Sequence, residues 1–220
     1  MNDIFTSRPH LPCHDVDKGC PVTDTTDFDA LEREDTARRA RLSAPTALLD
    51  AALWYAAVAG WPVFPLTVAG KTPATRNGFK DATTDLTQIR AWWSTASYNI
   101  GTPAGLTFDV IDIDGPEGFR SLADLWHAYC PPDCCDGRIC KPDRTHILGH
   151  RVHANAYTGG GGRHLLIEPT GQHNDARLLP GIDYRGIGGY IVIAPSIHAS
   201  GRRYDWIEPP GENLMRQVAA

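Results

Sequence analysis

The chain has 220 residues, of which 42% are hydrophobic and 21% charged, and its net charge is −5. This length suits one sizeable domain with at most a small appendage, and the absence of an internal repeat excludes a solenoid. No apolar run approaches the ~20 residues of a membrane helix, and residues 1–12 lack the basic start and apolar stretch of a signal peptide. We therefore expect a soluble cytoplasmic protein.

Charge is distributed unevenly along the chain. Residues 1–50 hold ten acidic and six basic residues, whereas residues 138–203 hold nine Lys or Arg and four Asp or Glu. A basic half joined to an acidic leader allows a local site for an anionic ligand, and nucleic acid is one candidate. Ordinary salt bridging on the surface explains the same charges equally well.

Regular structure is expected to begin near Pro45, after a polar leader over residues 1–44. Apolar residues at helical spacing predict a helix over residues 47–60, which Gly60 ends. The segment WPVFPL, residues 61–66, reads as a short strand between turn residues. Asp85 is placed to cap a second amphipathic helix with the sequence LTQIRAWW.

The second half of the chain alternates strands with one crossover helix. TFDVIDID, residues 107–114, is the strongest strand pattern, and a helix is expected over residues 117–129. After a Cys/His-rich stretch, two apolar segments flank a glycine run, and GYIVIAPS predicts another strand. This order indicates an α/β or α+β domain over residues 45–210, with residues 127–153 as an insertion and 211–220 as a tail.

Two carboxylates on the central strand are the first candidate for chemistry. Asp112 and Asp114 are two residues apart, so both project from one face, ~7 Å apart along the strand, and oxygen ligands suit hard divalent ions. Ile111 and Ile113 would face the other way, toward a helix layer. Asp109 would face the same side of the strand as the two isoleucines. A carboxylate on that buried face is compatible with the predicted strand only if Asp109 lies at the exposed start of the strand. An acidic turn that ends the strand accounts for the same pattern.

The glycine run and a third acid follow. The run from Thr158 to His164 would let the backbone approach a ligand closely and aim N–H groups at phosphate oxygens, with a mobile hairpin turn as the alternative. Asp183 is a further possible metal ligand or a turn residue. The Gly70-Lys71-Thr72 segment imitates a phosphate-binding P-loop, but Pro65 stands where that loop needs glycine, so no P-loop is expected.

Cysteines crowd into the insertion and do not resemble a secreted disulfide framework. Soft ligands for a structural zinc are offered there by Cys130, Cys134, Cys135 and Cys140, with His127, His146 and His150 nearby. Their spacing is not that of a standard C-x2-C pair. An irregular loop with free thiols remains the alternative.

In combination, these motifs resemble the bifunctional primase/polymerase (Prim-Pol) domain of the archaeo-eukaryotic primase superfamily, found in plasmid and phage replication proteins. The resemblance rests on DID, GGGGRH and IDYRGIGGYIVIAPSIHASGRRYDW in this order, and on the upstream segments GWPVFPL, GKTP, GFKDATTD, IRAWW and NIGTPAG. It extends from about Ala47 to Trp206. It implies a sheet core related to the RNA-recognition fold, with an additional α/β layer.

The resemblance also implies roles for individual residues. Asp112, Asp114 and Asp183 match the acidic motifs that hold Mg²⁺ or Mn²⁺, and His164 matches a histidine that contacts the triphosphate of the incoming nucleotide. The positions expected to bind the nucleotide are Gly160, Gly161, Gly162, Arg163, His164, Arg185, Ser196 and His198. Some relatives carry a zinc-bound stem between the first two motifs, where Cys130 to Cys140 lie here.

The resulting hypothesis is a DNA primase and DNA polymerase that joins nucleoside triphosphates on single-stranded DNA in a bacterial or archaeal host. Many relatives continue into a helicase, so a helicase domain or protein is an expected partner. A non-catalytic, zinc-stabilised nucleic-acid-binding module is the alternative. A DxD-type glycosyltransferase would leave the glycine run and Asp183 without a shared purpose.

Overall fold

The computed structural model describes residues 48–128, 146–211 and 214. The helical elements are α2 (Leu48–Trp54), the π-helical turn η1 (Tyr55–Ala59), the 3-10 turn η2 (Gly78–Asp81), α3 (Leu86–Trp93) and α4 (Gly115–Ala128). The strands are β1 (Phe64–Leu66), β2 (Asn99–Pro103), β3 (Asp109–Ile113), β4 (His146–Ile147), β5 (His150–Tyr157), β6 (Arg163–Ile167), β7 (Asp175–Leu179), β8 (Ile182–Arg185), β9 (Tyr190–Ile193) and β10 (Asp205–Glu208).

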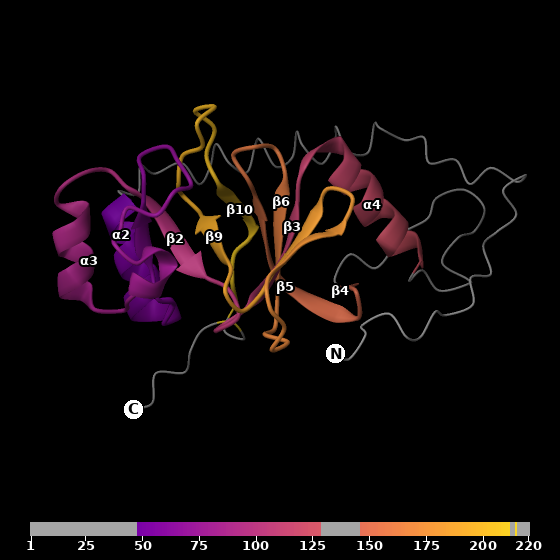
Figure 1. The fold of residues 1–220 in the computed structure, drawn as a ribbon, viewed down its shortest axis with the longest axis horizontal. Coiled ribbons are helices and arrows are strands. Elements are labelled where there is room, and N and C mark those ends of the chain that lie inside the picture. Colours follow the sequence, from indigo (N-terminus) through magenta and orange to yellow (C-terminus); the bar gives the residue numbers. More distant parts are fainter. Residues whose placement is uncertain (1–47, 129–145, 212–213, 215–220) are drawn as a thin grey trace, which may run out of the picture.

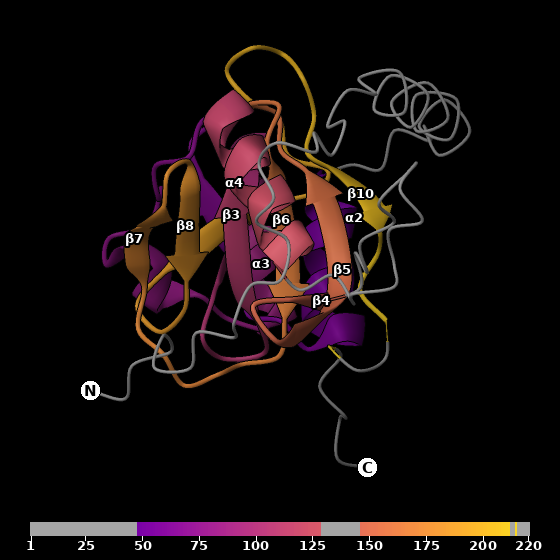
Figure 2. The ribbon, with the colours of Figure 1, turned by 90° about the vertical axis from the view of Figure 1, so that its right-hand side faces the viewer.

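Two sheets organise these elements into a mixed α/β fold, the class that the sequence predicts. The smaller sheet has the order β1-β2-β9, and the larger has the order β10-β5-β6-β3-β8-β7, with β4 paired to β5. Figure 1 places α2 and α3 beside the smaller sheet and α4 at the opposite end of the molecule. Turned by 90°, α4 lies across the larger sheet in front of β3 and β6 (Figure 2).

Both predicted N-terminal helices form for the reasons read from the sequence. The first runs from α2 into η1 and ends at Gly60, whose φ of 67° is the left-handed conformation that glycine adopts at a helix end. The second is α3, and the Asp85 carboxylate accepts a hydrogen bond from the Thr87 N–H at 2.8 Å. The one difference is the π-helical last turn of the first helix.

Aromatic residues close a core that joins distant parts of the chain. Trp61 is fully buried, and its indole N–H donates to the Leu214 carbonyl at 2.7 Å. The Tyr55 hydroxyl donates to the Ala194 carbonyl at 2.8 Å and accepts from the Trp206 indole at 2.7 Å. Leu214 is buried in the same cluster, so the packed unit reaches past residue 210.

Strand β3 divides its side chains between two faces, as its alternation predicts. Ile111 and Ile113 are fully buried in a cluster that includes Leu122 of α4. The expectation of an exposed Asp109 is wrong, because Asp109 is fully buried and the segment after β6 covers it. Its Oδ2 accepts hydrogen bonds from the Thr170 N–H at 2.7 Å and from the Tyr184 hydroxyl at 2.5 Å.

Among the described residues, no helix is both long and apolar enough to cross a lipid bilayer.

Candidate active site

Three of the predicted site residues lie in one row across the larger sheet. Asp112 in β3 stands directly opposite His164 in β6 on one side and opposite Asp183 in β8 on the other. Directly paired residues of neighbouring strands point to the same face, so the three side chains converge. The structure therefore brings together residues that the sequence places in three separate motifs.

Asp112 is held ionised by its neighbours. It is 9% exposed, and its Oδ1 lies 3.4 Å from Nε2 of His164. Its Oδ2 lies 3.1 Å from Nη2 of Arg185. Burial acts to raise the pKa of Asp112, but the charges and hydrogen bonds of His164 and Arg185 outweigh burial and lower that pKa to about 2.

Arg185 links two acids of the row. Its Nη2 lies 2.6 Å from Oδ2 of Asp183 as well as 3.1 Å from Asp112. The other carboxylate oxygen of Asp183 accepts a hydrogen bond from the Arg177 backbone N–H at 2.7 Å. Arg185 thus supplies the positive charge that keeps two neighbouring carboxylates together.

Asp114 follows the row at the end of β3, and its environment differs from that of Asp112. Partial burial raises the pKa of the Asp114 carboxyl, and the negative charges of Asp112 and Asp183 act in the same direction. Lys71 and His164 oppose that increase, which places Lys71 in the electrostatic environment of the site. Asp114 is the exposed member of the acidic set.

The glycine run forms a tight turn between β5 and β6. The Gly161 N–H donates to the Thr158 carbonyl at 3.0 Å, and the Gly162 N–H donates to the Thr158 hydroxyl at 2.9 Å. These two N–H groups serve the turn itself. Gly159 and Gly160 donate no backbone hydrogen bond within the described part of the chain, so their N–H groups suit the predicted contact with phosphate.

A second turn, residues 198–202, packs against the glycine run. The Ser200 hydroxyl donates to the Gly159 carbonyl at 3.2 Å, and Nη2 of Arg202 donates to the Gly160 carbonyl at 3.2 Å. A Cβ on Gly159 would lie 2.2 Å from the Cβ of His198, so the two turns meet only because residue 159 is glycine. We call the two turns together the double turn.

Two of the predicted nucleotide-binding residues lie away from this row. Arg163 pairs with Ile113, which puts its side chain on the opposite face from His164, where its guanidinium lies 4.4 Å from the Tyr157 ring centroid. Ser196 is fully buried, and its hydroxyl accepts a hydrogen bond from the Ile100 N–H at 2.9 Å. The Ser196 side chain therefore joins β2 to the end of β9.

A row of two acids and a histidine beside a glycine turn is what the three sequence motifs would build in a Prim-Pol domain. The model of that family, described as bifunctional DNA primase/polymerase, N-terminal, matches residues 52–220. The chain belongs to the Prim-Pol family. Comparison with curated proteins gives no match. Membership assigns this Prim-Pol domain to nucleotidyltransferases that act on DNA and nucleotides in replication.

Primases and polymerases of this family generally use divalent metals. In the described ranges, no three His, Cys, Asp or Glu side chains are already arranged to hold a metal ion. The chemistry of the donors fits a hard cation, because Asp112 and Asp183 face the same side of the sheet, Asp114 interacts electrostatically with both, and Asp112 stays ionised. Arg185 pairs with two of these three acids in this structure.

The zinc hypothesis concerns residues that lie mainly outside the described ranges. Cys130, Cys134, Cys135 and Cys140 all fall within the undescribed residues 129–145. His127 belongs to α4, and His146 is exposed in β4. A structural zinc, and its ligands, stay a prediction.

Sequence reasoning missed several residues that the fold brings to the candidate site. Lys71 was read only as part of a false P-loop, although its GKTP segment is one of those that carry the family resemblance. Arg202 had no signal of its own, because only packing places it on the glycine turn. Arg177 reaches Asp183 through the pairing of β7 with β8, which the sequence does not reveal.

Proposed function

We propose that the protein is a template-dependent nucleotidyltransferase that makes and extends primers on single-stranded DNA with two divalent metal ions, in the replication of a plasmid or phage. The observation that carries this proposal is the register of β3, which sets Asp112 directly between His164 and Asp183. Nucleotidyl transfer needs several carboxylates that converge on one place and a separate group for the triphosphate. The row and the double turn supply both.

The strand order supports the expected relation to the RNA-recognition fold. Four neighbouring strands of the larger sheet have the order β5-β6-β3-β8, and α4 connects β3 toward β5 on the face opposite Asp112. This is the arrangement of a split β-α-β unit. The smaller sheet with α2 and α3 would correspond to the additional α/β layer that the resemblance implies.

The reaction assigns work to residues of this chain. The 3′-hydroxyl oxygen of one nucleotide forms a bond to the α-phosphorus of the next as the bond from that phosphorus to the β-phosphate oxygen breaks. Pyrophosphate leaves, and the hydroxyl proton passes to solvent. Asp112, Asp114 and Asp183 would hold Mg²⁺ or Mn²⁺, which stabilises the entering and leaving oxygens. His164 and the double turn, with Arg202, bind the triphosphate.

The salt bridges of Arg185 hold the acidic side chains in place in the absence of substrate. Arg185 pairs with both Asp112 and Asp183, so the two carboxylates are positioned before substrate arrives. Its guanidinium can pair with phosphate oxygens as well as with carboxylates. Arg185 therefore belongs to the nucleotide-binding set that we propose, beside His164.

Primer synthesis on single-stranded DNA, without a supplied primer, tests the proposal directly. Wild-type protein with labelled nucleotides and Mg²⁺ or Mn²⁺ is expected to give product, and the Asp112→Ala/Asp114→Ala variant none. Asp124→Ala removes an exposed acid from α4 and should retain synthesis. Circular dichroism of the double variant checks that its fold is intact.

Two results would contradict the proposal. Synthesis retained by the folded double variant would exclude these carboxylates from catalysis. Failure of the wild type both to start primers and to extend a supplied one, combined with metal-independent DNA binding, would favour a non-catalytic binding module.

A further inference from the structure

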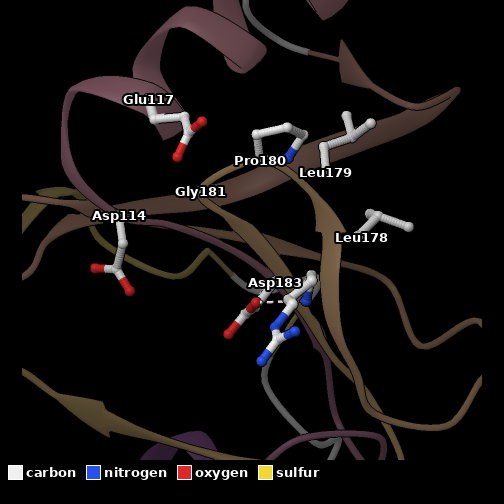
Figure 3. Close-up of a pocket in the computed structure, with 8 residues that line it drawn as sticks. Asp114, Glu117, Leu178, Leu179, Pro180, Gly181 and Asp183 are labelled. Carbon is white, nitrogen blue, oxygen red and sulfur yellow. Dashed lines mark hydrogen bonds between the residues drawn. The ribbon is translucent and has the colours of Figure 1, made fainter.

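A cavity of about 580 Å³ lies beside the acidic row, between the start of α4 and the hairpin of β7 and β8. Figure 3 shows Asp114 and Asp183 on one side of this space and Leu178 and Leu179 on the other. The turn that closes the hairpin is fixed to β3, because the Asp114 N–H donates to the Gly181 carbonyl at 2.8 Å. The volume lies within the ~300–1,000 Å³ of small-molecule sites.

The wall of this cavity contains a strained residue. Arg177 has a φ of 69°, in the left-handed region that non-glycine residues rarely adopt. The pairing of β7 with β8 shifts between Asp175 and Leu179, which leaves Arg177 in a bulge opposite Asp183. In this conformation the Arg177 N–H reaches the Asp183 carboxylate. Strain of this kind concentrates at functional sites.

The Arg177 side chain is exposed, and its guanidinium makes no hydrogen bond or ion pair with the residues that the structure describes. Its positive charge thus remains for a ligand at the cavity. The apolar lining of Leu178 and Leu179 would suit a sugar and a base edge, and the charge would suit a phosphate.

The order of the strands across the sheet places the cavity on the other side of Asp112 from the double turn. Across the sheet the order is β6-β3-β8-β7 (Figure 2). These four strands carry, in the same order, His164, Asp112, Asp183 and Arg177. The double turn stands at the β6 end and the cavity at the β7 end. In-line displacement puts the attacking hydroxyl and the leaving pyrophosphate on opposite sides of the α-phosphate.

We propose that this cavity binds the 3′-terminal nucleotide of the primer strand, with Arg177 on the phosphate that precedes it. Its 3′-hydroxyl then enters the acidic row from the β8 side, while the triphosphate lies on the double turn. The assignment rests on the proposed function, and it adds a separate site for the second substrate. Arg177 is the residue that determines binding of the primer terminus.

Primer extension with a chemically altered primer tests this assignment. The last internucleotide phosphate of the primer is replaced by a neutral methylphosphonate, and the KM for primer and for nucleotide are measured separately. Arg177→Gln is expected to raise the primer KM about tenfold, the lower end for a lost charge-assisted contact. The neutral primer should raise it equally with wild-type protein, and combining the two changes should add nothing further.

Controls separate this contact from general charge effects. Arg177→Lys keeps the charge and should restore most of the primer affinity, and Arg120→Gln removes an exposed charge from α4 and should change neither KM. The nucleotide KM should stay within about twofold throughout. An unchanged primer KM in Arg177→Gln, or losses that multiply to about a hundredfold, would overturn the assignment.

A wild-type protein that incorporates no nucleotide would contradict the proposed function instead. The same comparison is then made by fluorescence anisotropy, with a duplex that has a recessed 3′ end and either primer. Weaker binding of the neutral primer than of the unmodified primer, seen with wild-type protein but not with Arg177→Gln, would support the cavity assignment. Equal dissociation constants of wild-type protein for the two primers would overturn it.

Discussion

Replacing Gly162 by alanine should damage both the fold and the active site, whereas the same change at Gly160 should spare the fold. A Cβ at residue 162 would lie 2.1 Å from the Ile113 carbonyl oxygen, although Cβ atoms essentially never approach closer than 3.0 Å. The glycine turn or the end of β3 must therefore move by nearly 1 Å. Overpacking of this kind costs about 1–3 kcal/mol, or a Tm lower by roughly 2–12 °C.

The end of β3 carries Asp114, whose Oδ1 would lie 3.0 Å from the new Cβ. A displacement of about 1 Å at a reacting centre can lower the rate by ~100-fold, so Gly162→Ala should also lose primer synthesis. A Cβ at Gly160 meets its nearest atom, Oγ1 of Thr158, at 3.7 Å, which is an ordinary contact. We expect Gly160→Ala to keep its Tm or to raise it by up to about 4 °C.

Thermal unfolding and primer extension are measured for both variants. Equal Tm values and equal rates would refute the packing argument for Gly162. A Gly160→Ala protein that folds normally but has a raised nucleotide KM would indicate that glycine is required at residue 160 for phosphate binding and not for folding.

Two further predictions concern stability. With metal chelated, Asp112→Asn should lower the Tm at pH 7 and Asp114→Asn should raise it. The lowered pKa of Asp112 stabilises the fold above about pH 4 and loses that effect as pH falls toward 2, whereas the raised pKa of Asp114 opposes folding once the carboxyl ionises. Shifts of the same sign would contradict this. Tyr184→Phe should lower the free energy of unfolding, measured in urea, by about 1–3 kcal/mol, because buried Asp109 loses a hydrogen-bond donor. The control Tyr190→Phe removes an exposed hydroxyl and should lower the free energy of unfolding by less than about 0.5 kcal/mol. Equal losses in the two variants would contradict a stabilising role for the hydrogen bond to Asp109.

Short-range patterns in the sequence are enough to predict the elements around the site. The alternation in β3 correctly separates Asp112 from Ile111 and Ile113, because side-chain direction in a strand depends only on position. The Asp85 cap of α3 is equally local, since the carboxylate and the N–H that it accepts are two residues apart. The resemblance to the Prim-Pol family, carried by specific motifs, is confirmed.

Long-range pairing decides what the sequence does not reveal. The register that sets Asp112 opposite both His164 and Asp183 depends on how three separate strands align. Arg163 is a different case, because the local alternation of strand residues is enough to turn it to the face opposite His164. Asp109 breaks the apolar pattern of its face, and only the tertiary fold supplies its partners Thr170 and Tyr184.

The aromatic core around Trp61 has a consequence for synthesis of the chain on the ribosome. Trp61 donates its hydrogen bond to Leu214, which is 153 residues further along. At ~5–20 residues per second, Leu214 is made roughly 8–30 s after Trp61. During that interval Tyr55, which begins η1 directly after α2, also lacks its contacts with Ala194 and Trp206, so the helix formed by α2 and η1 has only part of its packing surface. This helix, the first in the described part of the chain, is therefore among the last to be completed in the folded protein.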